Sequence, residues 1–557
     1  MKIRDLDQYA KLISGDDQYR NKFDTLEYSF FKELYGGTFN IESRISEISD
    51  FAANANEQIF YEFLQNANDA GASSFFVAFD ESNFLVVNNG QPFLTDGKGQ
   101  ETSRFRTFLT KKQSANFGNE NIGEKGQGSK LLYELITDNL GTQATGDALI
   151  QEIYHHKKGP IILSWENTPL QYFMNWVDTP FQPVDCLKTG NTLLAKIIHT
   201  YFPVMPSNEA SSLFSMKEME RMLSFLREHA ALMNVADFVR GTLLYFPLGK
   251  GRYQAIKTAL EEGNLTRGLS TSLALLGNVQ RVKINDLLIQ RPHDLQGRVI
   301  SARKETSADG KERTINTRLF LPKSPQTLGN TYNFFQFFPI VEENHGLKFI
   351  IDSKEYKIEA SRQKIDLSKV YNERKLEEIS QAIIGHYVKL VEANNIDQAI
   401  HFIKCILLTD LAVLQNEVYK KLFYDDLIAA IKTKLPTHEN EFSNSEKVVV
   451  KDSNLLLHPR DIGQSGIYWL HPDLRDYYDL AKERLEIAIW KAKDILKNCA
   501  DEKRKEWVNN LAKADYQQLV KEIVSENTRA GIKGIPFIKA TNGELYALSD
   551  FERVVSK

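Results

Sequence analysis

Apolar side chains recur every three or four positions between residues 60 and 70. They are Phe60, Phe63, Leu64, Ala67 and Ala70. This spacing predicts a helix with one apolar stripe, and the glycine at position 71 predicts its end. On a neighbouring face, Glu62, Asn66 and Asp69 are separated by four and three residues, so their side chains project together. Taken alone, these three polar residues favour a solvated helix face over a functional site.

Two short apolar runs follow this helix, at residues 75–79 and 84–87, and both predict strands. The sequence Asn88-Asn89-Gly90 directly after the second run predicts a turn, which by itself could belong to a simple hairpin. A glycine pattern then precedes a helix-like run at residues 130–135; its members are Gly123, Gly126 and Gly128. Glycines before a helix let backbone N–H groups approach phosphate oxygens. Because a helix and then a strand precede this loop, the pattern argues against a dinucleotide-binding fold.

The order and spacing of these segments resemble those of the GHKL, or Bergerat-fold, ATPase superfamily. In that group the first helix reads E-x-x-x-N-x-x-D-A, as residues 62–70 do, and the third motif reads G-x-x-G-x-G, as residues 123–128 do. A fourth motif, Gly-Thr before an apolar strand, is matched by Gly241-Thr242. Thr192 in Gly190-Asn191-Thr192 is a second, lower-ranked match. Four motifs in this order over about two hundred residues make a chance match improbable.

The branch that the chain resembles most is the sacsin-type, heat-shock-ninety-like one. That branch has Asn-Gly-x-Pro-Phe at the second motif, as residues 89–93 do, and a lysine after the third motif, as Lys130. Further along, residues 338–363 are similar to its middle segment, which carries an arginine matched by Arg362. The resemblance covers roughly residues 25 to 370.

The resemblance implies ATP and Mg²⁺ as cofactors and a role for each matched residue. Glu62 would activate the attacking water, Asn66 would hold the metal ion, and Arg362 would offset charge on the terminal phosphate. The residues implied to bind the nucleotide are Asn66, Asp69, Asn88, Gly90, Gly123, Lys125, Gly126, Gly128 and Thr242. The alternative interpretation of Arg362 is a structural one, in which it forms a surface salt bridge with Glu359 or Asp366.

Asn88 departs from the family pattern, which usually has an aspartate that accepts a hydrogen bond from the adenine amino group. An asparagine amide carries one acceptor and two donors. With its oxygen toward the base it pairs with adenine, and in the flipped orientation it pairs with guanine. Adenine is therefore the expectation from the family, whereas the residue itself leaves both bases open.

The implied fold class is α+β. A Bergerat-fold α/β sandwich ATPase domain at residues 1–255, with a lid at about 94–121, precedes an α/β middle, transducer-like domain at 256–370 and a mixed, helix-rich C-terminal region at 371–557. Within these regions, residues 305–312 predict a hairpin tip. Residues 477–500 and 502–527 predict amphipathic helices. The stretch beginning Leu435-Pro436 is echoed by the one beginning Ile535-Pro536, a repeat of roughly one hundred residues.

Composition narrows the class of protein further. At 557 residues the chain needs more than one core. A net charge of −4 gives no basic footprint for nucleic acid. Three separated cysteines without metal spacing, no signal peptide and no apolar run of 18 residues favour a cytoplasmic protein without a membrane span.

We therefore expect a slow ATPase that closes a lid and switches conformation or forms a homodimer at least transiently, in a chaperone-like role with an unknown protein client. Two alternatives stay open: a weakly hydrolysing nucleotide sensor or scaffold, for instance in a bacterial defence module, and a MutL- or topoisomerase-like DNA machine. The DNA machine is disfavoured because the C-terminal part has no nuclease metal motif. A histidine kinase is disfavoured because no phospho-acceptor helix precedes the ATP motifs.

Overall fold

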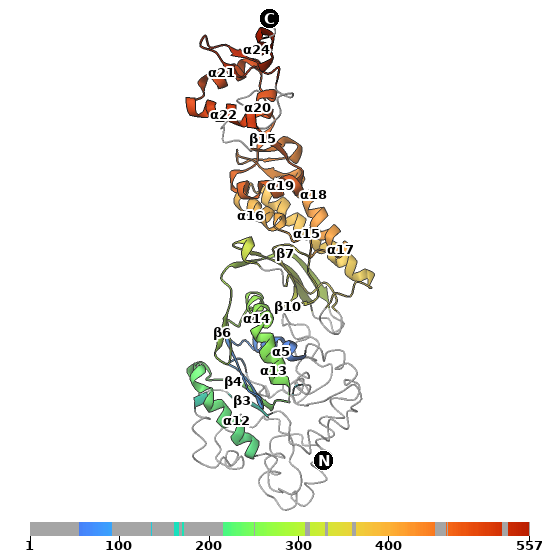
Figure 1. Cartoon of the computed structure of the whole chain (residues 1–557). Coiled ribbons are helices and arrows are strands. Elements are labelled where there is room, and N and C mark those ends of the chain that lie inside the picture. The colour runs from blue at the N-terminus through green and yellow to red at the C-terminus, as the bar shows by residue number, and fades with distance from the viewer. Residues whose placement is uncertain are drawn as a thin grey trace, which may run out of the picture.

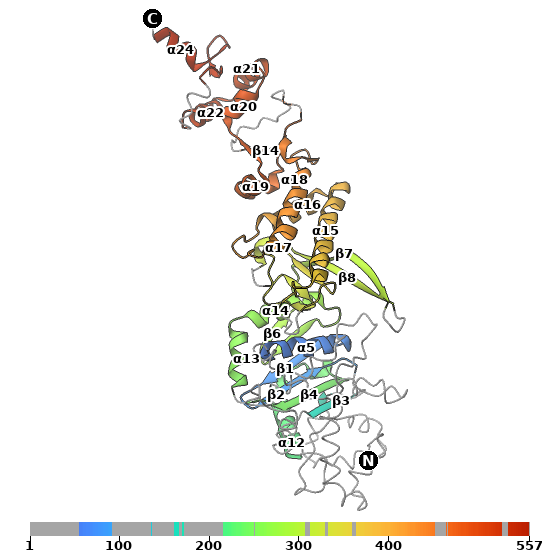
Figure 2. The same cartoon turned by 90° about the vertical axis from the view of Figure 1, so that its right-hand side faces the viewer.

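The protein, described from a computed structural model, is a mixed α+β chain, as expected. The structure describes residues 55–91, 135, 161–165, 170–171, 216–249, 251–306, 312–328, 332–358, 364–451, 464, 466–525 and 533–555. The described parts of the chain lie along one long axis (Figures 1 and 2). A first sheet lies toward one end, a second sheet lies in the middle, and the C-terminal helices lie at the other end.

The predicted helix and both predicted strands are confirmed in the first sheet. The helix is α5 (Ala55–Asp69), and the strands are β1 (Ser74–Phe79) and β2 (Asn83–Asn88). Six strands lie in the order β3-β4-β2-β1-β5-β6. The other four strands are β3 (Ile161–Trp165), β4 (Gly241–Pro247), β5 (Arg281–Ile284) and β6 (Leu287–Gln290). All neighbours are antiparallel except β1 and β5, which are parallel.

An aromatic contact sets α5 against one face of this sheet. The ring of Phe60 in α5 lies edge-on to Phe84 of β2 at 5.6 Å, and Phe84 stacks on Phe246 of β4 at 4.9 Å. Residues directly opposite each other in a sheet point to the same face. Phe84 and its partner Phe246 therefore mark the face of the sheet that α5 covers. By the two-residue period, Asn88 and its partner Thr242 lie on this same side.

Three further α-helices among the described residues belong to this part of the chain: α12 (Met216–Glu228), α13 (Arg252–Glu261) and α14 (Asn264–Leu275). Residues of α13 and α14 join the same apolar core as α5 and the sheet. Because β5 and β6 complete the first sheet, the predicted division at residue 255 passes through this packed unit.

The second sheet has five strands in the order β10-β9-β11-β8-β7. They are β7 (Leu295–Thr306), β8 (Glu312–Pro322), β9 (Phe334–Gln336), β10 (Phe338–Pro339) and β11 (Ile350–Ser353). Thr306 pairs with Glu312, so the hairpin predicted around residues 305–312 is confirmed on both flanks. The helix α15 (Val370–Glu392) packs its apolar side into the core that this sheet shares with the helices beyond it.

The remaining helices and short strands form the C-terminal part of the molecule. The helices are α16 (Ile396–Leu407), α17 (Glu417–Tyr419), a π-helical turn (Lys420–Asp425), α18 (Asp426–Thr433), α19 (Tyr478–Leu485), α20 (Ala492–Asn498), α21 (Asp501–Asn510), α22 (Lys513–Ser525) and α24 (Leu548–Val555). The strands are β12 (Leu435–Pro436), β13 (Phe442–Ser443), β14 (Val448–Lys451), β15 (Tyr468–Trp469), β16 (Ala488–Trp490), β17 (Ile538–Lys539) and β18 (Leu545–Tyr546).

The single helix predicted over residues 477–500 is wrong. Helix α19 ends at Leu485, the residue after it, Glu486, has a left-handed φ of 56°, and the strand β16 that follows pairs with β14 in parallel. Residues 487–490 are four consecutive apolar residues, and periodicity alone cannot assign such a run to a helix or to a strand. The predicted helix at 502–527 is likewise divided, since α21 and α22 are separated at Leu511.

Candidate nucleotide site

Helix α5 carries its polar strip next to the side that packs on the sheet. Glu62 is buried, with 4% of its surface exposed, and Asn66 and Asp69 are half-buried. Glu62 and Asp69 are seven residues apart, which places them about 10 Å apart along the helix axis. A strip of this length is comparable to the span from the base to the terminal phosphate of a nucleotide. The three predicted residues therefore lie along one continuous polar wall.

The C-terminal end of α5 is fixed against the turn after β2. Gly71 adopts a φ of 73°, and the N–H of Ala72 donates to the carbonyl of Ala67 at 2.9 Å, as in a glycine-capped helix end. The N–H of Gln91 donates to the carbonyl of Ala70 at 2.7 Å. A side chain at Gly90 would lie 2.7 Å from the Cβ of Ala70. Gly90 is thus required for this close approach, and the predicted turn touches the end of the helix.

Glycine at position 241 brings the last of the four motifs against the second. A Cβ atom there would lie 2.0 Å from the carbonyl oxygen of Asn88. With glycine, β4 begins directly beside the end of β2, and Thr242 stands opposite Asn88 in register. Thr242 is buried, with 7% of its surface exposed. Two motifs that are separated by about 150 residues in sequence therefore meet on the α5 side of the sheet.

The side chain of Asn88 has a defined orientation. Its Oδ1 accepts a hydrogen bond from the backbone N–H of Gly90 at 3.1 Å. Because an N–H group only donates, the atom facing Gly90 is the oxygen, and the NH₂ group points away from this turn. Asn88 is half-buried. The NH₂ group is thus left for a contact with a ligand, while Oδ1 keeps one lone pair beyond its bond to Gly90.

Sequence reasoning missed two asparagines that build the site. Asn89 accepts hydrogen bonds from the N–H groups of Ser73 and Ser74, both at 2.9 Å, and so ties the turn to the start of β1. Asn68 accepts from the N–H of Asn278 at 3.0 Å, which ties α5 to the segment before β5. The only sequence signal for these contacts is the presence of asparagine at a helix end and in a turn, where it commonly bonds to backbone.

Several predicted site residues lie outside the described residues. They are Gly123, Lys125, Gly126 and Gly128 of the glycine motif, Arg362, and the lid at about residues 94–121. The alternative Thr192 also lies outside them. The structure thus brings together Glu62, Asn66, Asp69, Asn88, Gly90 and Thr242 as one wall and one strand end.

The oxygen ligands on this wall fit a magnesium ion that is held mainly by phosphates. Asn66 supplies a half-buried amide oxygen one turn beyond the buried carboxylate of Glu62. Mg²⁺ commonly takes one or two protein oxygens and completes its shell with water and substrate phosphates. Among the described residues, no group of three or more His, Cys, Asp or Glu side chains is arranged to hold a metal by itself.

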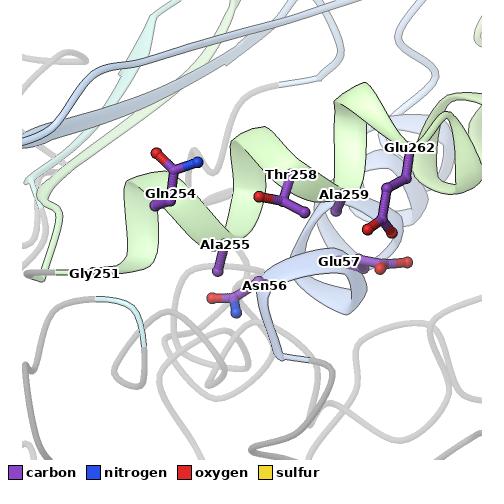
Figure 3. Close-up of a pocket in the computed structure, with 8 residues that line it drawn as sticks. All are labelled: Asn56, Glu57, Gly251, Gln254, Ala255, Thr258, Ala259 and Glu262. Carbon is purple, nitrogen blue, oxygen red and sulfur yellow. The ribbon is translucent and has the colours of Figure 1, made fainter.

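A pocket of about 430 Å³ opens at the N-terminal end of α5, between this helix and α13. Figure 3 shows Glu57 and Glu262 lying close together at one end of it. Burial raises the pKa of Glu57, and the charge of Glu262 raises it further. Asn56 of this pocket is 13 residues from Asp69, or about 20 Å along the helix. The pocket is therefore separate from the turn at Asn88.

We compared the chain with known protein families and with curated proteins. The chain matches no model of a known protein family, and a search among curated proteins finds no match. In the described part of the chain, no helix has both the length and the apolar content needed to cross a membrane.

Proposed function

We propose that the chain binds a nucleoside triphosphate with Mg²⁺ and hydrolyses it slowly, as a GHKL-type ATPase with a Bergerat-fold domain. The observation that carries this proposal is the meeting of three motifs at one place. The polar strip of α5, the Asn88–Gly90 turn and Thr242 come from distant parts of the chain, and contacts that need Gly90 and Gly241 hold them together. A solvated helix face has no need of such glycines.

Glu62 and Asn66 form the phosphate end of the proposed site. Bound Mg²⁺ would neutralise phosphate charge during hydrolysis. The amide oxygen of Asn66 is the protein ligand for that ion. The carboxylate of Glu62, one turn earlier, orients the attacking water and accepts its proton. Burial of Glu62, with 4% exposed, keeps bulk water away from this carboxylate.

Asn88 forms the base end of the proposed site, with Asp69 and Thr242 as its supports. Gly123, Gly126, Gly128 and Lys125 are proposed to hold the phosphates. Arg362 is proposed to offset the charge that develops on the terminal phosphate. ATP is the nucleotide that the family resemblance implies.

Turnover is expected to be slow because a lid at about residues 94–121 and the second sheet must first assemble around the site. In this proposal hydrolysis times a conformational switch that includes transient homodimerisation, in a chaperone-like role. A protein that binds nucleotide without turnover would instead fit the sensor or scaffold function.

The test is a pair of measurements on purified full-length protein: calorimetric titration with a non-hydrolysable triphosphate and phosphate release with ATP. Glu62→Ala should bind with wild-type affinity and lose at least about a hundredfold in turnover, the scale of general-base catalysis. Asn66→Ala should lose magnesium-dependent binding. Glu57→Ala is the matched control, because it removes a carboxylate from the same helix off the polar strip, and it should keep turnover.

Wild-type turnover in Glu62→Ala would eliminate the proposed base. Failure of the wild-type chain to bind any triphosphate would eliminate the proposed function altogether. Nucleotide binding without turnover in the wild type would support the proposed binding site but would favour the sensor function over the ATPase.

A further inference from the structure

Tyr61 precedes Glu62 on α5 and faces a different part of the molecule. Its side chain is buried, with 6% exposed, and its ring lies 5.3 Å from the ring of Phe338 at a tilt of 42°. Phe338 belongs to β10 in the second sheet. Its side chain is nevertheless a member of the apolar core of the first sheet. The helix of the proposed site therefore contacts the second sheet directly.

A third element closes this contact. Gly268 of α14 lies under the hydroxyl of Tyr61, so closely that a Cβ atom at position 268 would stand 1.9 Å from that oxygen and 3.4 Å from Pro339. Glycine inside a helix normally lowers its stability relative to alanine. Its presence here is explained by the need to admit Tyr61. Helices α5 and α14 and strand β10 thus meet without spare space.

The residue before Phe338 is held in an unusual backbone conformation. Phe337 has a φ of 66°, which L side chains rarely adopt. Its N–H donates to Oδ1 of Asp352 in β11 at 2.7 Å. The other oxygen of Asp352 accepts from Arg318 at 2.8 and 2.6 Å. A partly buried ion pair within the second sheet therefore fixes the backbone that places Phe338 against Tyr61.

Arg318 also reaches back to the first unit. Its Nη1 donates to the carbonyl of Leu275, the last residue of α14, at 2.8 Å. Helix α14 is consequently attached to the second sheet at two places: near its middle through Gly268 and Pro339, and at its end through Arg318. A displacement of the second sheet must move α14 and, through Tyr61, α5.

We propose, on the basis of the function proposed above, that Phe338 is a positioning residue for the candidate site. Through Tyr61 it sets the placement of α5, so that the second sheet regulates the residue next to Tyr61, Glu62. Because Tyr61 and Phe338 meet in the core of the first sheet at its contact with the second sheet, loosening this contact changes the alignment of Glu62 more than it changes the affinity for nucleotide.

Two matched pairs of variants test this in the full-length chain. Phe338→Leu loosens the contact. Its control is Phe349→Leu, at a fully buried phenylalanine in the core of the second sheet and its helices. Gly268→Ala pushes on Tyr61. Its control is Gly277→Ala, where a Cβ would meet nothing within 4 Å.

The first readout is amide hydrogen exchange of α5 without nucleotide. Phe338→Leu and Gly268→Ala should each speed exchange at residues 60–69 by about tenfold, whereas both controls should change it by less than about twofold. The second readout is kinetic. Phe338→Leu should lower kcat about tenfold with the nucleotide Kd changed by less than about threefold, because alignment rather than binding is affected.

Equal exchange of α5 in Phe338→Leu and Phe349→Leu would overturn the proposal, since a general loss of stability would then explain both. A loss of affinity without a loss of kcat would overturn it as well. If the wild-type chain binds no nucleotide, that measurement rejects the proposed function. The positioning role is then rejected as well, because it is defined relative to the nucleotide site. The exchange comparison would still report separately whether the contact itself couples the two sheets.

Discussion

Asn88 illustrates how one backbone contact decides the chemistry of a side chain. The sequence leaves the orientation of this amide open, and with it the choice between adenine and guanine. With Oδ1 bonded to the Gly90 N–H, the NH₂ group is the end of the amide that does not face this turn. A donor at this place matches the C6 oxygen of guanine, whereas a carboxylate matches the C6 amino group of adenine.

The resulting prediction concerns base preference. Asn88→Asp should shift the ratio of ATP to GTP affinity toward ATP by about tenfold, the value of roughly one hydrogen bond. Competitive titration of both nucleotides against the wild-type and variant proteins measures this ratio. Inosine triphosphate, which has the C6 oxygen but lacks the 2-amino group, isolates the contribution of the C6 position. An unchanged ratio would show that Asn88 does not contact the base.

His345 gives a prediction about pH. Its ring is completely buried beside Phe334, at 4.7 Å, and burial lowers its pKa to about 3. The folded protein thus holds His345 neutral while the unfolded chain binds a proton below its ordinary pKa of 6.5. The stability that this neutral ring contributes is complete above pH 6.5 and is lost as the pH falls toward 3, by about 1.4 kcal/mol per pH unit.

His345→Gln should reduce this dependence, because glutamine does not titrate and can still accept the hydrogen bond that the Leu347 N–H gives to Nδ1. Urea denaturation at pH 7, 6 and 5 measures the free energy of unfolding of both proteins. The wild-type value should fall more steeply, by about 2 kcal/mol at pH 5 relative to pH 7. Parallel lines for the two proteins would show that His345 titrates alike in the folded and unfolded states.

At the scale of elements, the faint repeat in the C-terminal part corresponds to a repeated hairpin. Strands β12 and β13 pair as β17 and β18 do, with Leu435 and Ile538 at equivalent positions, 103 residues apart. In both turns the same two backbone hydrogen bonds form. The N–H groups of Thr437 and Asn440 donate to Glu441 and Thr437 in the first turn, and those of Ala540 and Gly543 donate to Glu544 and Ala540 in the second. The alignment suggested by the two Leu/Ile-Pro pairs is therefore displaced by three residues.

Each turn has one residue with positive φ, Asn440 at 59° and Gly543 at 80°. Gly543→Ala should destabilise the C-terminal part by about 1 kcal/mol, because nothing but the backbone conformation opposes the new Cβ. Gly543→Asn should cost less, since asparagine adopts this conformation more readily. Thermal unfolding of both variants gives the comparison, and equal losses would show that the turn conformation is not the cause.

Local patterns predicted the elements that depend on nearby residues. Helix α5, strands β1 and β2 and the long β7–β8 hairpin follow from periodicity and turn residues within a few positions. Contacts between segments that are far apart in sequence could not be predicted from these local patterns. The parallel pairing of β1 with β5 joins segments about two hundred residues apart, and β16 was hidden within a helical pattern because its partner β14 lies far away in sequence.

The candidate site was predictable only as a set of motifs. The recurrence of Glu62, Asn66 and Asp69 on one strip follows from helical spacing. Their meeting with Thr242 depends on the register between β2 and β4. The contact of Tyr61 with Phe338 has no local signal, because it depends on how two sheets pack.

At the scale of the whole molecule, the described residues form three large apolar cores in chain order, around the first sheet, around the second sheet with α15 to α19, and around α20 to α22. A small fourth core joins Leu275 of α14 to Phe320, Phe335 and Ile350 of the second sheet. Figures 1 and 2 show these parts along one axis, with α12 toward one end, the C-terminal helices at the other, and α5 on the side of the first sheet that faces the second sheet. The junction at Phe338 lies in the core of the first sheet, at its contact with the second sheet. A change at α5 can therefore reach the remainder of the chain only by way of the second sheet, among the parts that the structure describes.

The most direct test of the central claim is an experimental structure of the full-length chain with Mg²⁺ and a non-hydrolysable nucleoside triphosphate. We predict the terminal phosphate and the metal ion beside Glu62 and Asn66, and the base beside Asn88 and Thr242. A nucleotide bound away from this wall, or a Glu62 side chain directed away from the terminal phosphate, would contradict the account.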